Sequence, residues 1–390
     1  MFDLRLLKRV DWALFAAVMG LSLYGLVMIY SATRAPEAAG LGPPSQFAQK
    51  QAIWLLVGLG AFAITLVWEY ESLARWHLPL YLLVMLLLAA VLKIGQSPTG
   101  ASSWIGMGGF RLQPSELAKI AVILSLGAFV SRRADVVAEL PVVLRSLAIA
   151  AAPVLLVLLQ PDFGTALVII AIWFGVLYLG GASRKQLGAI FVSGLLLFAM
   201  MWNVDRLPIE RFPAPVAQAL AKARLRDYQK RRLTIFLNPR SDPLGAGYHV
   251  IQSRLAIGSG ELTGRGLFHG SQSRLRFIPE RHTDFIFSVV GEELGLVGSA
   301  AMLLLYLFLF WRGLRIAARA RDMLGSLLAA GAVSMLIFHT IVNVGMSINI
   351  MPITGIPLPF VSYGGSNMLA SFVAFGLLQN VHMRRTRIIF

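Results

Sequence analysis

Ten apolar runs, each close to the length of a membrane-crossing helix, dominate this 390-residue chain. A transmembrane helix needs about 20 mainly apolar residues. The runs cover residues 12–31, 52–68, 78–94, 115–131, 143–160, 164–182, 187–204, 285–311, 323–345 and 367–382. They predict an all-α polytopic membrane protein with about ten transmembrane helices.

The composition agrees with a single membrane domain over residues 1–390. Hydrophobic residues make up 57% of the chain and charged residues 14%, which excludes a soluble enzyme and a disordered protein. The absence of cysteine excludes a secreted disulfide scaffold. The first apolar run is too long for the core of a signal peptide, so we expect a retained first span.

Lysine and arginine predict the orientation of the spans. With a cytoplasmic N-terminus, the short inside segments hold fifteen of these residues and the short outside loops hold three. Because positive residues collect on the cytoplasmic side, we expect both termini in the cytoplasm. The net charge of +16 then indicates the anionic headgroups of the lipid bilayer as partner. No nucleic-acid-binding module is visible, so we expect no nucleic acid.

Residues 205–284 form one long loop that this topology places outside the cell. The loop is too long to be a simple connection, which indicates a functional element. Its first part, Val216–Arg232, is strongly basic. It predicts either a helix lying on the membrane surface or a basic rim that attracts an anionic, membrane-bound substrate.

Ionisable residues inside apolar runs are costly, so each one is a candidate site residue. Glu116 and Lys119 lie three positions apart after Pro114, which suits a helix start. They predict an ion pair. The pair is either structural or lines a polar cavity open to the outer surface, where the ammonium of Lys119 would hold a phosphate group.

Asp284 lies where the long loop enters the eighth apolar run. Thr283 is a candidate N-cap, which would place Asp284 in the first helical turn. On a regular helix Gly291 and Gly295 share its face, and such small residues pack against another helix. We therefore expect Asp284 to face the interior near the outer surface, as a general base or simply as a well-placed cap carboxylate.

Two further features fall on the same outer side. Asp162 lies in a tight turn between the fifth and sixth runs, where it is either functional or a cap residue. Residues 351–366 are apolar but rich in proline and glycine, so they cannot continue a helix. Such backbone is tolerated at membrane depth only where protein or a wet cavity covers it.

Several other kinds of site are not indicated. The chain has no phosphate-binding P-loop, no zinc-protease motif and no convincing serine–histidine–aspartate set. Six scattered histidines give no metal-ligand spacing. We expect no metal site and no evident cofactor, although a divalent cation without an assignable ligand set could assist a phosphate leaving group.

The outer-side residues belong to longer motifs that resemble a known family. In chain order these are Trp104-Ile105, Gln113–Lys119, Pro161–Thr165, Asp242–His249, Gln252-Ser253, Ile257–Gly260, Pro279–Phe287, Glu292–Gly298 and Thr354–Ser366. They resemble the SEDS family (shape, elongation, division, sporulation), most closely its RodA type. One departure is Glu261, where the family usually has a second glycine, which raises a question about that turn's conformation.

The resemblance implies a peptidoglycan glycosyltransferase that polymerises lipid II into β-1,4 glycan strands during elongation of rod-shaped cells. It also implies a bacterial plasma membrane location, a class B penicillin-binding transpeptidase as partner and contact with other elongation-complex membrane proteins. In that family the position of Asp284 is catalytic. Those of Glu116 and Lys119 line the same cavity, and those of Trp104 and Asp162 are functionally important.

The implied chemistry fits an active site on the extracytoplasmic side. As a hypothesis, Asp284 takes the proton of an acceptor 4-hydroxyl that attacks the donor sugar and expels undecaprenyl pyrophosphate. Lys119 or a basic loop residue such as Arg281 would stabilise the leaving group. A lipid II flippase and a non-catalytic scaffold for the transpeptidase remain alternatives, because intramembrane charges and broken helices also occur in transporters. Another glycan polymerase or ligase matches fewer of the motifs.

Overall fold

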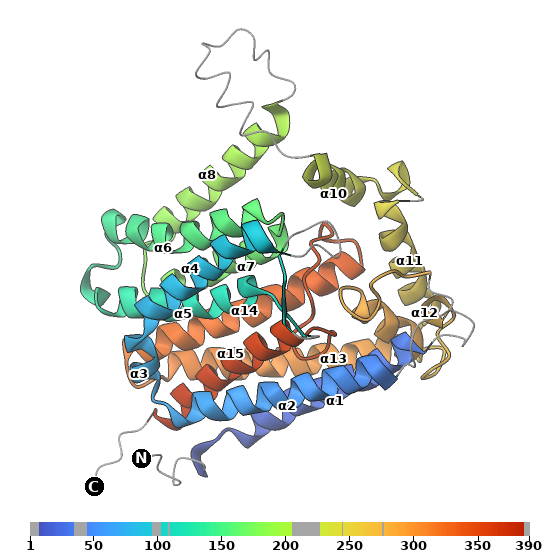
Figure 1. Ribbon diagram of the computed structural model, residues 1–390, viewed down its shortest axis with the longest axis horizontal. Helices are drawn as coiled ribbons and strands as arrows, with labels where there is room; N and C mark the ends of the chain where they lie inside the picture. The colour runs from blue at the N-terminus through green and yellow to red at the C-terminus, as the bar shows by residue number, and fades with distance from the viewer. Residues whose placement is uncertain are drawn as a thin grey trace.

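The computed structural model describes residues 8–34, 45–95, 103–107, 110–204, 227–243, 245–274 and 277–385. Each of the ten apolar runs forms a helix (Figure 1). In chain order these helices are α1 (Trp12–Thr33), α2 (Ser45–Val67), α4 (His77–Ile94), α5 (Pro114–Ser131), α6 (Leu140–Leu159), α7 (Phe163–Leu179), α8 (Arg184–Asn203), α13 (Ile286–Ala318), α14 (Met323–Ser347) and α15 (Gly365–Met383). The all-α polytopic fold class is therefore confirmed.

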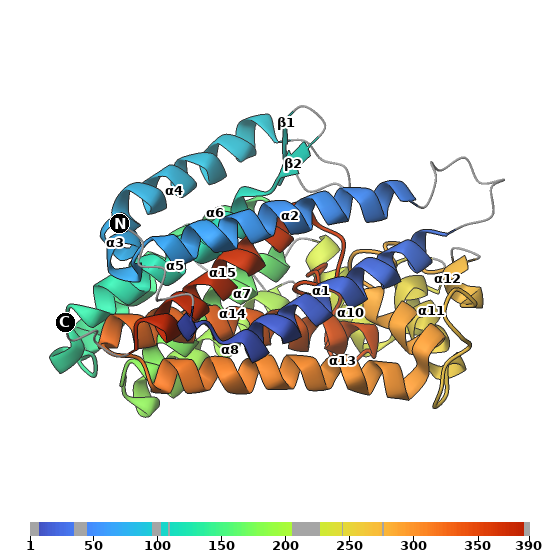
Figure 2. The same cartoon turned by 90° about the horizontal axis from the view of Figure 1, so that it is seen from below.

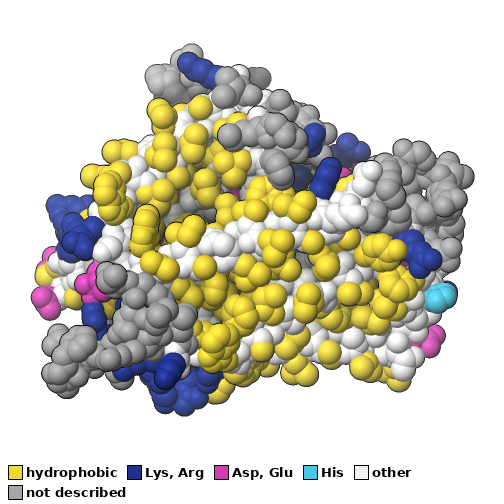
Figure 3. All heavy atoms as spheres, turned by 60° about the horizontal axis from the view of Figure 1, so that its bottom comes forward, with side chains coloured by type: hydrophobic (Ala, Val, Ile, Leu, Met, Phe, Trp, Pro, Cys, Tyr) yellow, Lys and Arg dark blue, Asp and Glu magenta, His cyan; other side chains and the backbone are white. Residues whose placement is uncertain are grey.

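By length and composition, seven described helices can cross a membrane: α1, α2, α5, α6, α8, α13 and α14. Helices α4 and α7 are shorter apolar helices, and α15 has 19 residues. Large apolar side chains remain exposed along α1, α2, α4, α6, α8 and α13, as expected for helices that face lipid. Figure 3 shows a broad apolar face with Lys and Arg side chains near its left end.

The remaining described elements are short. They are α3 (Tyr70–Arg75), the 3-10 turns η3 (Ala134–Val136) and η6 (Pro239–Ser241), α10 (Asp227–Leu237), α11 (Ala246–Ser259) and α12 (Ser271–Arg274). Strands β1 (Ile105–Met107) and β2 (Phe110–Leu112) form an antiparallel hairpin with Ile105 opposite Leu112. The sequence did not predict this hairpin. Of the basic stretch Val216–Arg232, residues 216–226 lie outside the described residues, and the rest begins α10.

Helix α14 lies at the centre of the bundle, packed against α5, α7, α13 and α15. Its inner faces carry small and branched side chains that are fully buried, as are most side chains of α5. Helix α8 is peripheral, and only its Leu187 is buried (Figure 1). Helix α5, which carries Glu116 and Lys119, and its neighbour α14 are thus deeply buried, unlike α8.

Aspartate side chains cap the N-termini of three of the long helices. Asp11, Asp162 and Asp322 accept hydrogen bonds from the backbone N–H groups of Leu14, Thr165 and Gly325 at 3.1, 3.0 and 2.7 Å. Each bond satisfies one amide that a helix start leaves without an intrahelical partner. The turn and cap role expected for Asp162 is therefore confirmed.

The described ends of the chain meet at one end of the bundle. The backbone N–H of Asp11 donates to Gln379 Oε1 at 3.0 Å, and Gln379 Nε2 donates to the Asp11 carbonyl at 2.9 Å. Helices α10, α11 and α12 lie at the opposite end (Figures 1 and 2). This arrangement agrees with two termini on one side of the membrane, while the cytoplasmic assignment of that side stays a prediction.

Helix α13 is not the regular helix expected after Asp284. It begins at Ile286, and its backbone leaves the helical conformation at Gly295, where φ is 61° and ψ is −158°. A side chain there would collide with the backbone of Leu262 and Gly264. The close packing expected at Gly291 is confirmed, against Ile257 of α11. At Gly295 the neighbour is a turn of the long loop, not a second helix.

Candidate active site

The irregular segment of residues 352–364, between α14 and α15, connects the polar residues of interest. Its backbone is largely buried, with Leu358 and Phe360 closed to solvent. The amide N–H of Leu358 donates to Ser362 Oγ at 2.8 Å, and the carbonyl of Ile356 accepts from Asn343 Nδ2 at 2.8 Å. The expected break in the helix is confirmed, and protein groups satisfy these parts of its backbone.

Asp284 lies in a turn that this segment holds in place. The carbonyls of His282, Thr283 and Asp284 accept, in that order, from Tyr363 N at 2.9 Å, Ser362 Oγ at 2.6 Å and Asn343 Nδ2 at 2.8 Å. Three consecutive peptide groups are therefore fixed from outside the turn. The position of the Asp284 side chain thus depends on residues 59 to 81 positions further along the chain than their partners.

The predicted helix cap at Thr283 is wrong. Phe285 is the N-cap of α13, so Asp284 precedes the helix instead of lying in its first turn. The Thr283 hydroxyl donates to the carbonyl and the carboxylate of Glu280, at 3.1 and 3.0 Å. Glu280 has a positive φ of 50° and begins a tight turn. In this turn the Thr283 hydroxyl bonds to Glu280 and therefore does not cap the helix.

The surroundings of Asp284 make it a stronger base than an ordinary aspartate. Desolvation by the surrounding protein, reinforced by the negative charges of Glu280 and Asp162, raises the pKa of its carboxyl to about 7, although Arg232 opposes the shift. Its Oδ2 also lies 3.4 Å from where a Cβ on Gly355 would stand. The carboxylate is thus a partly exposed group beside the irregular segment with a pKa suited to proton transfer near neutral pH.

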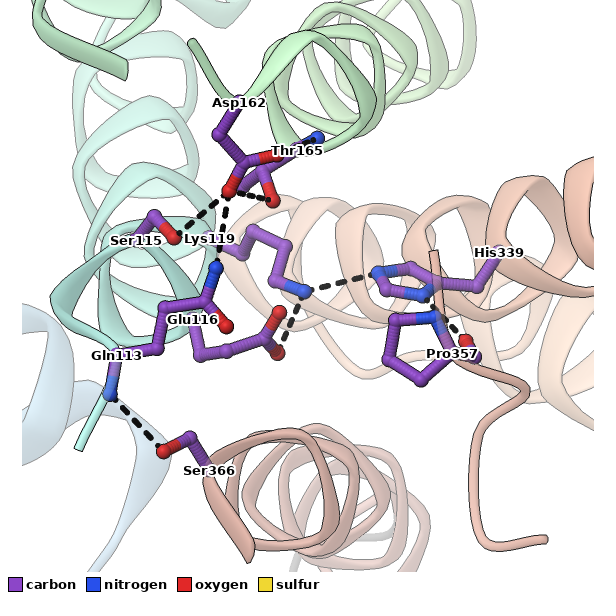
Figure 4. Close-up of polar contacts among 9 residues, drawn as sticks. All are labelled: Gln113, Ser115, Glu116, Lys119, Asp162, Thr165, His339, Pro357 and Ser366. Atoms are coloured by element: carbon purple, nitrogen blue, oxygen red, sulfur yellow. Dashed lines mark hydrogen bonds and ion pairs between the residues drawn. The ribbon is translucent and has the colours of Figure 1, made fainter. Parts of the chain in front are cut away.

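Glu116 and Lys119 form the predicted ion pair, with Lys119 Nζ 2.6 Å from Glu116 Oε2 (Figure 4). Lys119 Nζ also lies 2.9 Å from Nε2 of His339, whose Nδ1 is 3.1 Å from the Pro357 carbonyl. The relative exposure of Lys119 is 0% and that of Glu116 is 2%. The pair therefore reaches the irregular segment through His339 and is closed to solvent in this structure.

Asp162 connects the starts of α5 and α7. Its Oδ2 accepts from Gln113 Nε2 at 2.9 Å, Ser115 Oγ at 3.3 Å and Thr165 Oγ1 at 2.8 Å (Figure 4). The backbone N–H of Gln113 donates to Ser366 Oγ at 3.0 Å. This network ties both helix starts to the start of α15, beside the irregular segment.

Two other sequence-predicted residues lie at the edges of this region. Trp104 directly precedes β1 and is half-buried, at the base of the hairpin that leads into α5. Arg281 is buried, and its Nε donates to the Ala32 carbonyl near the end of α1 at 2.5 Å. The structure thus brings Glu116, Lys119, Asp162 and Asp284 to one segment, while this contact directs Arg281 toward α1.

His339 and Asn343 were missed by the reasoning from sequence. They lie four positions apart in α14, so they share one face of an otherwise apolar helix, and Ser347 continues the spacing. This spacing of four residues between polar side chains could have been recognised in the sequence. Arg232, which acts electrostatically on Asp284, was visible only as the last residue of a basic stretch.

Nothing in the described part of the chain brings three or more His, Asp or Glu side chains together as a metal-ligand group. The suggestion that a divalent cation assists the reaction stays a prediction.

The comparison with family models identifies the chain. Residues 11–387 match the FtsW/RodA/SpoVE model, described as cell cycle protein. The chain belongs to this family. The resemblance inferred from the motifs is therefore confirmed, and this family is the one named SEDS above.

Relatives in the family match over nearly their full lengths. The peptidoglycan glycosyltransferase MrdB of Escherichia coli strain K12 is 37% identical over 381 residues, covering 97% of this chain and 94% of MrdB. The probable peptidoglycan glycosyltransferase FtsW of Geobacter metallireducens is 34% identical, covering 98% and 97%. Stage V sporulation protein E of Bacillus subtilis is 35% identical, covering 92% of each chain.

Solved structures of the family share the fold. A chain from work described as structural coordination of polymerization and crosslinking by a peptidoglycan synthase complex has a TM-score of 0.77 and 32% identity, covering 97% of this chain and 99% of that one. Thermus thermophilus rod shape determining protein RodA has a TM-score of 0.68 and 29% identity, covering 97% and 98%. Together with the apolar helices, these likenesses make the chain an integral inner-membrane protein of the SEDS family.

Proposed function

We propose that this chain is a peptidoglycan glycosyltransferase that polymerises lipid II into β-1,4 glycan strands for cell elongation, with Asp284 as its general base. The observation that carries the assignment of the base is the raised pKa of a partly exposed carboxylate in an anchored turn. The names of MrdB and FtsW, which match over nearly the whole chain, support the activity.

The reaction is a single displacement. The carboxylate of Asp284 accepts the proton of the acceptor sugar's 4-hydroxyl as that oxygen forms a bond to C1 of the donor. The bond from C1 to the pyrophosphate oxygen breaks, and undecaprenyl pyrophosphate leaves with the electron pair. Attack from the opposite face inverts the α-linked donor to a β-1,4 product. General-base assistance of this kind is worth about 10²–10⁴-fold in rate.

Glu116, Lys119, Asp162 and Trp104 form the proposed substrate-binding wall. Asp162 and the Glu116–Lys119 pair lie where the starts of α5 and α7 meet the irregular segment. Because the ammonium of Lys119 is covered in this structure, direct contact with pyrophosphate requires the wall to open. Until it opens, Lys119 acts on the segment beside Asp284 through His339 and Pro357.

Arg281 is proposed to stabilise the leaving group from the other side of the turn. Its contact with Ala32 of α1 would have to be exchanged for the pyrophosphate. Arg232, which already acts on Asp284, is the better placed cation in this structure.

The proposed partners are lipid II, a class B penicillin-binding transpeptidase and further membrane proteins of the elongation machinery, in a bacterial plasma membrane. The structural likeness to a chain of a peptidoglycan synthase complex supports a membrane-bound partner that cross-links the strands. The proposed orientation places the termini in the cytoplasm and Asp284 on the extracytoplasmic side.

The test is a gel assay of glycan products from labelled lipid II, with the purified protein and its penicillin-binding partner. We expect polymer from the wild type and none from Asp284→Ala. Asp135→Ala, which removes an exposed carboxylate in η3, is the matched control and should polymerise normally. Normal polymer from Asp284→Ala would refute Asp284 as the base. Lipid movement without polymer from any variant would favour the flippase, and neither activity would favour the scaffold.

A further inference from the structure

A basic pocket lies at the end of the bundle opposite Asp284. It has a volume of about 680 Å³ and is formed by the start of α1, the end of α13 and the end of α15. Its cationic lining residues are Lys8, Arg9, Arg312, Arg315, Arg319 and Arg385. Asp11 is the one acidic residue among those that line it in the described chain.

The described lining residues neutralise only part of the charge of the pocket. Asp11 Oδ2 lies 2.6 Å from Arg312 Nη2, and Arg9 has an interaction of its own, so the excess charge is that of Lys8, Arg315, Arg319 and Arg385. Burial opposes ionisation of Asp11, but the hydrogen bonds from Arg312 and Leu14 hold the pKa of its carboxyl below the usual value. The ionised carboxylate of Asp11 therefore neutralises Arg312. The excess positive charge, drawn from three segments far apart in the sequence, favours an anion.

Two tryptophans place the pocket at the membrane surface. Trp12, which lines it, is 60% exposed, and Trp311, which directly precedes the lining residue Arg312, is 52% exposed. Tryptophan favours the headgroup level of a bilayer. The guanidinium of Arg315 lies 5.3 Å from the Trp311 ring centre, so part of the basic lining is held at the same level.

Helix α13 also carries exposed apolar side chains on the turns beside the pocket. Leu304, Leu307, Trp311 and Leu314 are exposed and follow one another at intervals of three or four residues, so they share one face of the helix. This apolar face lies roughly 100° around the helix axis from the arginines that line the pocket. The acyl chains of a phospholipid bound at the pocket could contact such exposed apolar side chains, whereas a free phosphate could not.

We propose that this pocket binds the phosphate headgroup of an acidic phospholipid. It is distinct from the catalytic region, because Arg312 lies 26 residues along α13 from Ile286, roughly 40 Å at helical rise. The lipid joins α1, α13 and α15, which are already linked here by Asp11, Arg312 and Gln379. General electrostatic attraction to the membrane surface would not require basic residues of three segments to line one pocket.

The test is native mass spectrometry of the full-length protein titrated separately with cardiolipin, phosphatidylglycerol, phosphatidylethanolamine and undecaprenyl phosphate. We expect the wild type to bind the two acidic phospholipids more tightly than phosphatidylethanolamine. The double variant Arg315→Ala/Arg319→Ala should bind them about 30-fold more weakly. The matched control is Arg184→Ala/Lys185→Ala, which removes two exposed cations at the start of α8 and should change binding less than twofold.

Equal weakening in both double variants would overturn the proposal, since it would show general electrostatic attraction. Full displacement of the acidic phospholipid by inorganic phosphate would indicate a site for a free anion. Tighter binding of undecaprenyl phosphate than of either phospholipid would assign the pocket to a polyprenyl carrier. If Arg315→Ala/Arg319→Ala does not fold, Lys8→Ala/Arg385→Ala alters the same pocket from the other two segments and should show the same loss.

Discussion

The side-chain amide of Asn343 holds the backbone of Asp284, with Nδ2 2.8 Å from the Asp284 carbonyl oxygen. The same nitrogen donates to the Ile356 carbonyl at 2.8 Å. One buried amide in the middle of an apolar bundle thus joins the turn of the proposed base to the irregular segment. Its own Oδ1 accepts no hydrogen bond within the described part of the chain.

Replacing Asn343 should therefore reduce turnover. In Asn343→Ala the two carbonyls lose their donor, which destabilises the protein by about 1–3 kcal/mol. A shift of the carboxylate by about 1 Å can cost about 10²-fold in rate. We expect kcat to fall about 10- to 100-fold with little change in KM. Asn203→Ala, at the edge of the bundle, is the control and should leave kcat unchanged. An unchanged kcat in Asn343→Ala would show that the turn keeps its position without the amide.

The pKa of Asp284 predicts the pH profile of polymerisation. A general base works only when deprotonated, so kcat/KM should rise tenfold per pH unit below about 7 and level off above it. His249 and His282 also face this region, but burial lowers their pKa values. The profile should therefore be the same in His249→Gln. A midpoint that moves with that substitution would assign the titration to the histidine.

The same shift predicts that Asp284 reduces stability. Its folded pKa of about 7 lies above the ordinary aspartate pKa of 3.8, so the folded state binds the extra proton between these two values. Stability from this group therefore falls as the pH rises from about 4 to about 7. The variant Asp284→Asn cannot ionise there, and its melting temperature should exceed that of the wild type by a few degrees at pH 8. The gain should vanish toward pH 4, and a constant difference across that range would contradict the raised pKa.

The sequence predicted the ten helices because the length of an apolar run is a local property. It also predicted the Glu116–Lys119 pair, since residues three apart share a helix face. It did not predict the contact of Lys119 with His339, which lies 220 positions away. The break at Gly295 was equally out of reach, because a turn of the long loop packed against it imposes the conformation.

The outer-side polar groups were predicted to converge, and the described geometry brings most of them to residues 352–364. The reason is topological, since features at the same ends of packed helices must meet. The cap at Thr283 was predicted wrongly because the competing acceptors on Glu280 depend on a backbone turn with positive φ. Local capping rules do not include that turn.

The buried pair of Glu116 and Lys119 should be far more sensitive to the loss of one partner than of both. Lys119→Met leaves the Glu116 carboxylate buried without its cation, which costs about 3–5 kcal/mol. The double variant Glu116→Gln/Lys119→Met removes both charges and should recover most of that loss. Melting temperatures of the two single variants and the double variant in detergent measure the coupling. Additive losses would show that the two charges do not stabilise each other.

Glu261 has a backbone conformation that glycine would adopt at less cost. It follows the end of α11 with a φ of 48°, and its exposed side chain accepts no hydrogen bond in the described structure. A left-handed residue just after a helix end favours glycine, and a side chain there costs about 1 kcal/mol. Glu261→Gly should therefore raise the stability by about that amount, measured as an increase in melting temperature. Glu139→Gly makes the same chemical change where φ is −76° and should give no increase, because glycine there only gains freedom in the unfolded chain. A higher melting temperature in both variants would mean that the lost charge, not the backbone of Glu261, is responsible.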